Sequence, residues 1–300
     1  MKNVLIISFS QTSQANVIAQ QVCRDLYDHE DVHVSFYEIT LKDPFPYPWN
    51  SETFFDAFPE TFQQIPREIV PPSDEILNGN YDLVIFSYQV WYLTPSLPVV
   101  SFLKSEYAEK LLSGRKVVSI VSCRNMWAKA HDKMGEHFRR LNAERAGHIA
   151  LVDRANNYAS VITIVHWLYS GKKTRYLGFF PLPGVSDKDI EESERFGQPI
   201  LQALLTDNYT PLQKQLIDLK AVEIKPFLII VDRTANKIFS FWSKKILTKK
   251  TNRKRWVTFF KYYLLFALWV ISPIVLLLYN ITYPLRLKSI KADIKHYQSI

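Results

Sequence analysis

The sequence predicts an α/β fold with a doubly wound parallel sheet, followed by a helical tail that associates with a membrane. Three observations lead to this prediction. Short apolar segments alternate with helical patterns, polar loops follow several of these segments, and a long uncharged apolar run lies near the C-terminus. A chain of 300 residues that is 47% hydrophobic can bury one substantial core and carry an appendage.

The elements follow from the hydrophobic patterning. The expected strands are residues 3–9, 32–38, 82–87, 116–121 and 147–152. The expected helices are residues 14–28, 97–111, 126–142 and 186–205, the last with its N-terminal cap at Ser186. This alternation predicts a flavodoxin-like, five-stranded parallel sheet with the strand order 2-1-3-4-5. In that order ligands bind where the first and third strands diverge, so the loops after residues 9, 87 and 121 should meet.

The chain is expected to divide into three parts. Residues 1–205 form the flavodoxin-like domain, residues 206–235 form a linker, and residues 236–300 form the tail. Two aromatic-rich excursions, 40–73 and 153–184, exceed what a minimal sheet needs. Such excursions favour lids or walls of a site, and extra packing on the sheet edge is the alternative.

The tail carries the basic charge of the chain. Residues 232–300 hold fourteen Lys or Arg and two acidic residues, whereas the remainder has a net charge of −4. Residues 237–247 have an amphipathic pattern with lysines, which predicts a helix at the membrane interface. The uncharged run 262–279 would extend about 27 Å as a helix, close to the roughly 30 Å hydrocarbon core of a bilayer. The aromatic residues beside this run favour lipid over nucleic acid as the binding partner of the basic tail.

Basic residues flank this apolar run on both sides, which leaves two arrangements open. The run spans the membrane with the N-terminal domain in the cytoplasm, or it bends at Pro273 and leaves by the face it entered. A buried core helix is a third alternative. The first strand is too short for a secretory signal, so the domain is expected in the cytoplasm, attached to the cytoplasmic membrane by its tail.

The loop after the first strand predicts a phosphate site. It consists of Ser10, Gln11, Thr12, Ser13, Gln14 and Ala15, directly before a helix. The loop has no Lys or Arg, and the chain has no G-x-G or Walker spacing. Backbone N–H groups, hydroxyls and the helix dipole would therefore hold the phosphate, as flavodoxins hold that of FMN. An ordinary capped turn is the alternative, and Ser13 stands where these loops often have glycine.

The next two loops are candidates for contacting the isoalloxazine ring of FMN. The first supplies Gln89, Val90, Trp91, Tyr92 and Leu93, and the second supplies Cys123, Arg124 and Asn125. Aromatic faces pack a flat ring, while a cation such as Arg124 stabilises developing negative charge. Packing of the aromatic residues in the core is the alternative.

The region after the fifth strand offers further polar candidates. Arg154 follows the strand, and His166 lies in the apolar segment 158–169. His166 is a candidate base, although a lone histidine on an apolar helix is more often a core residue. Cys23 and Cys123 fall on separate elements, so neither a disulfide framework nor a metal site is expected.

Several sequence blocks together resemble the flavodoxin-like proteins known as dialkylresorcinol-condensing enzymes. These blocks are Ser10-Gln-Thr12, Phe45-Pro-Tyr-Pro-Trp49, Phe54-Phe-Asp-Ala-Phe-Pro59, Trp91-Tyr-Leu-Thr-Pro-Ser96, Cys123-Arg-Asn-Met-Trp127, Asn156 to Trp167 and Pro183-Gly-Val-Ser-Asp187. The resemblance covers residues 1–205 and extends more loosely into the tail. It implies an aromatase that works beside a ketosynthase and oxidises a dialkyl cyclohexane-1,3-dione to a dialkylresorcinol.

On this reading FMN accepts a hydride, and the catalytic candidates are Arg124, Arg154, Tyr92 and His166. The first three would stabilise the enolate of the lipid-like dione, and His166 is a candidate for the base, whose identity the sequence leaves open. A homodimer is a further expectation. Other readings are a membrane-tethered NAD(P)H:quinone oxidoreductase, an electron carrier, and a flavodoxin-like tether without flavin. The domain charge of −4 argues against an electron carrier, which usually has a strongly acidic face.

Overall fold

The computed structural model of this chain describes residues 1–300, except for the side chain of Lys250. Its centre is a parallel sheet of five strands in the order β2-β1-β3-β5-β6. The strands are β1 (Lys2–Ser8), β2 (Val32–Glu38), β3 (Leu83–Trp91), β5 (Lys116–Cys123) and β6 (Glu144–Val152). Numbered in the order of the five long strands, this is the flavodoxin-like order 2-1-3-4-5 that the sequence predicts. The fold class is therefore confirmed.

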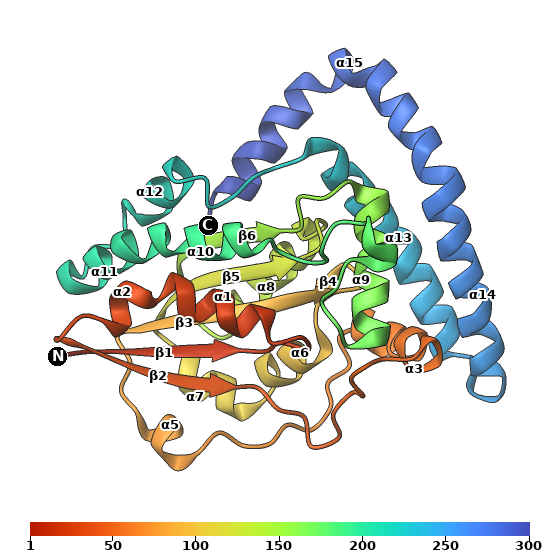
Figure 1. Ribbon diagram of the computed structural model, residues 1–300. Coiled ribbons are helices and arrows are strands. Elements are labelled where there is room, and N and C mark those ends of the chain that lie inside the picture. The colour runs from red at the N-terminus through yellow and green to blue at the C-terminus, as the bar shows by residue number, and fades with distance from the viewer.

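Helices cover both faces of the sheet (Figure 1). On one face lie α1 (Gln14–Val22), α2 (Arg24–Tyr27), α10 (Asp187–Glu191), η2 (Glu192–Phe196), α11 (Gly197–Thr206) and α12 (Leu212–Asp218). On the other lie α5 (Asp74–Asn78), α6 (Leu97–Leu103), α7 (Glu106–Leu112) and α8 (Ala128–Arg140). Three of the expected helices are interrupted, at Cys23, at Lys104 and Ser105, and around Glu192. The Ser186 hydroxyl accepts a hydrogen bond from the Asp189 amide, so its predicted capping role is confirmed.

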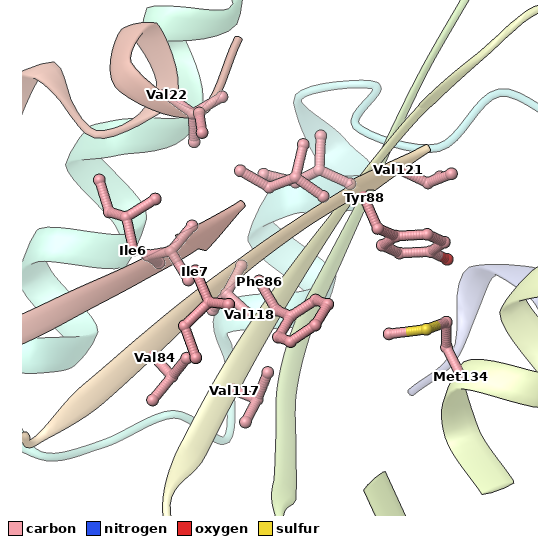
Figure 2. Close-up of a cluster of buried hydrophobic side chains, with 14 of the residues drawn as sticks. Ile6, Ile7, Val22, Val84, Phe86, Tyr88, Val117, Val118, Val121 and Met134 are labelled. Carbon is pink, nitrogen blue, oxygen red and sulfur yellow. The ribbon is translucent and has the colours of Figure 1, made fainter. Parts of the chain in front are cut away.

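The core consists of the apolar side chains of the central strands. Figure 2 shows Val22 of α1 on one side of the sheet and Met134 of α8 on the other, with Phe86 of β3 between the strands and α8. All three are buried. Strands that are buried on both faces read as continuous apolar runs, which is why the sequence locates them well.

The sequence does not predict one short strand. β4 (Thr94–Pro95) pairs antiparallel with the end of β3 through a two-residue turn. Tyr92 and Leu93 form this turn with φ values of 50° and 63°. Such a turn normally carries Asn or Gly, so its residues here provide no local signal. The expected five strands are therefore six.

The region predicted as a linker, residues 206–235, contains α12 and the start of α13 (Pro226–Leu247). Leu212 and Leu216 of α12 pack in the core beside β6. The amphipathic stretch 237–247 also lies differently from the expectation. Its Phe239 and Ile246 belong to a second hydrophobic cluster, separate from the core of the sheet. The buried members of this second cluster are Phe55, Phe58, Phe62, Phe239, Ile246, Val257 and Phe260. Protein therefore covers this apolar face, which is not available to a membrane interface.

The partners of that face come from the first aromatic excursion. It contains α3 (Ser51–Asp56) and α4 (Phe58–Phe62), which pack against α13 and the following helix. The Phe58 ring stacks on the Phe260 ring at a centroid distance of 3.8 Å. A sequence pattern shows that a face is apolar but does not show what covers it, and this accounts for the difference.

The tail is one helical run from Arg253 to Gln298, long and apolar enough to cross a membrane, with 6% of its most apolar window buried. It comprises α14 (Arg253–Phe266), a π-helical turn η4 (Ala267–Ile271) and α15 (Ser272–Gln298), after the short η3 (Lys250–Asn252). Figure 1 shows it as an arch that rises from the sheet domain and returns to it. Pro284 lies inside α15, and proline removes a helical hydrogen bond and bends a helix.

Both ends of the arch are bonded to the sheet domain. At its start, Arg253 pairs with Asp56 at 2.6 Å and with Glu60 at 2.7 Å. At its end, Asp293 accepts hydrogen bonds from the Arg233 guanidinium of α13 at 2.6 and 3.0 Å, and His296 Nε2 lies 3.1 Å from Asp132 Oδ1 of α8. The two ends of the arch therefore lie on the same body.

Candidate functional site

The loop between β1 and α1 has backbone N–H groups free for an anion. The Gln11 amide donates to Gln89 Oε1 and the Ala15 amide donates to Ser10 Oγ, each at 3.0 Å. Among the described residues, no acceptor takes a hydrogen bond from the amides of Thr12, Ser13 and Gln14. These three successive amides stand at the positive end of α1, a combination that suits a phosphate.

Ser13 itself takes the conformation that makes this loop possible. Its φ of 61° is left-handed, and its side chain is exposed. A residue with a Cβ enters this region at a cost of roughly 1–2 kcal/mol, which is why glycine is more usual there. The structure thus accommodates Ser13 in the glycine-like conformation that the sequence left in question.

A distant segment fastens onto this loop. The Gln14 side chain donates to the Val185 carbonyl and accepts from the Val185 amide, both at 3.0 Å. The amide of the preceding residue, Gly184, donates to Asp153 Oδ2 at 3.2 Å, and Asp153 is buried directly after β6. Gly184 falls in the block 183–187 that carries the family resemblance, but neither Gly184 nor Asp153 is among the predicted site residues. The sequence signal for Gly184 is that it is one of only eight glycines.

We expect Gly184→Ala to disturb this fastening. Gly184 has a φ of +80°, and a Cβ there would stand 2.5 Å from Gln14 Oε1 and 2.7 Å from the Trp167 ring. Gly178→Ala is the matched control because its φ of +76° imposes the same backbone strain with no atom within 4 Å. Urea unfolding should show a loss for Gly184→Ala that is roughly 1–2 kcal/mol larger. Equal losses would mean that the 183–185 segment is free to move away.

The second loop forms an aromatic wall at the carboxyl edge of the sheet. The Trp91 ring lies edge-on to Phe9 at 5.7 Å, to Phe45 at 5.3 Å and to Trp49 at 5.4 Å between centroids. Gln89, on the same strand, reaches the phosphate loop through the bond to Gln11 described above, and Val90 pairs with Pro95 of β4. The wall therefore adjoins the candidate anion site.

Tyr92 does not present a free hydroxyl to this site. Its left-handed backbone directs it into the second cluster, where its ring lies 5.3 Å from Phe54 and 5.4 Å from Phe58. Its hydroxyl donates to the Phe54 carbonyl, and burial raises its pKa well above the usual value. Leu93 packs against the same cluster. The structure therefore supports a packing role for Tyr92 and corrects the expectation that its hydroxyl faces a substrate.

The third loop is tied to α9 (Asn157–Ser170). Arg124 donates from one guanidinium nitrogen to the Asn157 carbonyl at 3.0 Å, to Asn157 Oδ1 at 2.9 Å and to Ser160 Oγ at 3.2 Å. Asn125 Nδ2 donates to the same Asn157 Oδ1 at 2.9 Å. Burial lowers the pKa of Arg124 to about 10, so it stays charged at neutral pH. Burial also raises the pKa of the Cys123 thiol, which argues against a reactive thiolate.

We expect Arg124→Ala to destabilise this junction because it leaves the start of α9 with unpaired acceptors. The loss should be about 1.5–3 kcal/mol, the usual range for hydrogen bonds to a charged group. Urea unfolding of the full-length variant and of the wild type measures this difference in the free energy of unfolding. Arg124→Lys is the control that keeps the charge, and its loss should be smaller. A variant at wild-type stability would show that the junction does not depend on the guanidinium.

The other two catalytic candidates, Arg154 and His166, have partners of their own. Arg154 pairs with Asp189 at 2.9 Å and also with Glu223, so two carboxylates neutralise its charge. This corrects the expectation of a free cation at position 154. His166 lies on α9 with its Nε2 atom 3.2 Å from Thr174 Oγ1 and its ring 5.0 Å from that of Tyr176, in the η1 turn (Tyr176–Gly178).

Asp232 is a buried acid that the sequence analysis missed. One of its carboxylate oxygens accepts a hydrogen bond from the Lys129 amide at 3.2 Å, at the start of α8, and burial raises its pKa to about 7. The signal in the sequence is an acid that directly follows the apolar run 227–231. Its place at a helix start is typical of a capping role. Within the described part of the chain, no group of His, Cys, Asp and Glu could hold a metal ion.

Comparison with known proteins yields structural neighbours only. No family model and no curated protein matches the chain. Oxidised flavodoxin 1 from Bacillus cereus has 14% identity and a TM-score of 0.38, covering 67% of this chain and 98% of that one. A flavoprotein in complex with FMN from Lactobacillus acidophilus has 17% identity and a TM-score of 0.37, covering 50% and 93%. A flavodoxin from Streptococcus pneumoniae has 16% identity and a TM-score of 0.37, covering 65% and 95%.

These values are low, so the fold assignment rests on the strand order and the parallel connections described above. β1 and β3 are neighbours in the sheet, and the chain leaves their carboxyl ends toward α1 on one face and α6 on the other. The free amides and the aromatic wall adjoin at these ends. That is the topological position at which open α/β sheets bind their ligands. The chain has a flavodoxin-like fold.

Proposed function

We propose that this protein binds FMN at the carboxyl edge of its sheet and uses it to oxidise a lipid-like cyclohexane-1,3-dione to a resorcinol. The observation that carries the cofactor proposal is the set of three free amides at the start of α1, beside an aromatic wall. The residues present fit the group, because the amides suit a phosphate and Trp91 suits a flat ring. The substrate class rests on the family resemblance in the sequence.

The oxidation converts the dione ring to an aromatic ring by removal of two hydrogen atoms, one as a hydride and one as a proton. When bound, FMN accepts the hydride. The chain supplies the remaining functions. The loop 10–15 holds the phosphate, and the wall around Trp91 and Trp49 excludes water from the ring. Arg124, which carries charge at neutral pH, is our choice to stabilise the enolate oxygen of the dione.

His166 is our choice for the base that takes the proton. Its Nε2 atom lies 3.2 Å from Thr174 Oγ1, and in the tautomer in which Nε2 donates to that hydroxyl, Nδ1 is the atom that would accept the proton. A 1,3-dione is already acidic, so the base needs no unusual strength. Arg154 and Tyr92 are not retained in the proposal, because their polar groups are occupied by carboxylates and by the Phe54 carbonyl, respectively.

We propose further that the domain is cytoplasmic and is held at the cytoplasmic membrane by the arch 253–298. The support is its length, its exposed apolar surface and the basic residues on both flanks. A ketosynthase that supplies the dione is the expected partner, and a homodimer remains part of the proposal. A substrate with alkyl chains would reach the protein from the bilayer without crossing water.

The experiment is an absorption spectrum of detergent-purified protein, repeated anaerobically after addition of a dialkyl cyclohexane-1,3-dione. Flavin bands that bleach as resorcinol forms are the expected result. Bound flavin that ignores the dione and bleaches with NADPH would replace the proposal with a quinone reductase. A colourless protein that also fails to take up added FMN would contradict the cofactor proposal and leave a tether.

A further inference from the structure

An apolar groove runs between α9 and the rising arm of the arch. Its volume is about 490 Å³, within the range of small-molecule pockets. Its walls include Val161, Ile162 and Val165 of α9 and Leu265 and Trp269 of the arch. Its described lining contains no Lys, Arg, Asp or Glu, and His166 is its one imidazole. Charged or phosphorylated ligands therefore do not suit it.

One wall of the groove is continuous with the membrane-directed surface. Trp269 belongs to the same helical run as Phe266, Ile274 and Leu277, which expose their side chains to solvent. An apolar molecule dissolved among lipid chains around this arm would meet the groove without leaving an apolar environment. The molecule would not pass through water on this path, so the free energy of its transfer into the groove is small.

Aromatic contacts connect the lining of the groove with the sheet edge. Tyr169 lines the groove and lies 6.1 Å from Phe54. Phe54 lies 5.7 Å from Trp49, which in turn lies 5.4 Å from Trp91 in the aromatic wall. A series of aromatic side chains in contact therefore connects the groove with the wall beside the candidate flavin site.

We propose that this groove binds an alkyl chain of a lipid-like ligand that enters from the bilayer along the arch. The direction of entry toward the sheet edge rests on the proposed function, whereas binding of the chain does not. A peptide helix is a less suitable occupant, because it would bring polar backbone ends or charged side chains against a lining that has few partners for them. Uncharged alkyl chains need no such partners.

The test is photo-crosslinking with a diazirine derivative of palmitic acid. The full chain is reconstituted in vesicles of phosphatidylcholine and phosphatidylglycerol that contain the probe, irradiated, digested and mapped by mass spectrometry. We expect crosslinks on the α9 peptide in addition to those on the exposed part of the arch. Crosslinks on the arch alone would overturn the proposal, because simple insertion into lipid produces them.

Two substitutions to tryptophan sharpen this result. Val165→Trp on α9 fills the groove. Val270→Trp is the matched control, because Val270 is an exposed valine on the arch that does not line the groove. We expect Val165→Trp to lower α9 crosslinking at least tenfold and leave arch crosslinking and vesicle flotation unchanged. Ile162→Trp is the second groove-filling variant if Val165→Trp fails to fold. Unchanged α9 crosslinking in a folded groove-filling variant would contradict the proposal.

The readout requires neither flavin nor turnover, so the two proposals fail separately. Crosslinking on α9 in a protein that binds no flavin would support the proposal that the groove binds an alkyl chain and would contradict the proposed reaction. Flavin-dependent dione oxidation without α9 crosslinks would support the proposed reaction and contradict the proposal that the groove binds an alkyl chain.

Discussion

The double substitution Leu277→Lys and Leu278→Lys is expected to release the protein from membranes. Both leucines lie on the arch with 61% and 55% of their surface exposed, so the protein does not cover them. A lysine at bilayer depth costs roughly 2.5–3.5 kcal/mol, so two cost about 5–7 kcal/mol, or at least a thousandfold in partitioning. Flotation with phosphatidylcholine and phosphatidylglycerol vesicles measures the change.

The control is a pair of equivalent charges placed outside the arch. Leu205→Lys and Val17→Lys alter exposed apolar residues of the helices on the sheet, and they add the same net charge. This pair should float with the vesicles as wild type does. If the Leu277 and Leu278 variant also floats, the arch does not insert its apolar surface, and the basic residues alone hold the protein at the membrane.

The docking of both ends predicts the topology of the inserted arch. Arg253 pairs with Asp56, and His296 near the C-terminus lies 3.1 Å from the Asp132 carboxylate of α8, so the C-terminus should stay with the sheet domain on the proposed cytoplasmic side. Ser299→Cys should therefore react with an impermeant maleimide only after intact cells are permeabilised, measured against the background of the native cysteines. Labelling in intact cells would show that the helix crosses the membrane and that its last turns leave the domain.

The second large effect is expected at the phosphate loop. Thr12→Asp places a carboxylate among the three free amides, where the FMN phosphate is proposed to bind. Two like charges about 4 Å apart repel by roughly 1 kcal/mol in water and roughly 4 kcal/mol near a protein surface. We expect FMN affinity to fall by about 100-fold, or about 2.7 kcal/mol. Quenching of flavin fluorescence during titration of the flavin-free protein provides the two dissociation constants.

Thr210→Asp is the matched control, because it makes the same change at an exposed threonine between α11 and α12. Its FMN affinity should remain within about twofold of wild type, since exposed charges more than a Debye length apart are largely screened. Equal losses in the two variants would point to an effect of net charge, and no loss in either would place the phosphate elsewhere.

The strands, the order of the sheet and the position of the candidate site could be predicted from the sequence, because each depends on local or general rules. A strand buried on both faces must be apolar along most of its length, as residues 83–86 are throughout and residues 117–121 are except for Ser119. Parallel strands need crossovers of one hand, which limits the topologies. The loop 10–15 could be recognised because its polar residues stand between a strand and a helix.

The roles of individual side chains depended on partners far away in the chain. Asp189 and Glu223 form ion pairs with Arg154 and neutralise its charge, and Arg124 is hydrogen-bonded to the start of α9. The orientation of Tyr92 follows from two left-handed residues in a turn without glycine. Periodicity describes which face of an element is apolar but does not say which element covers it.

The tail shows the same division most clearly. Its apolar run, its basic flanks and its helical character follow from composition, because a bilayer selects for length and hydrophobicity. Whether it spans or returns depends on contacts between residues far apart in sequence, such as Arg253 with Glu60 and Arg233 with Asp293. Those ion pairs form only when the folded sheet domain brings their partners together, so only the tertiary structure could show that both ends meet the same body.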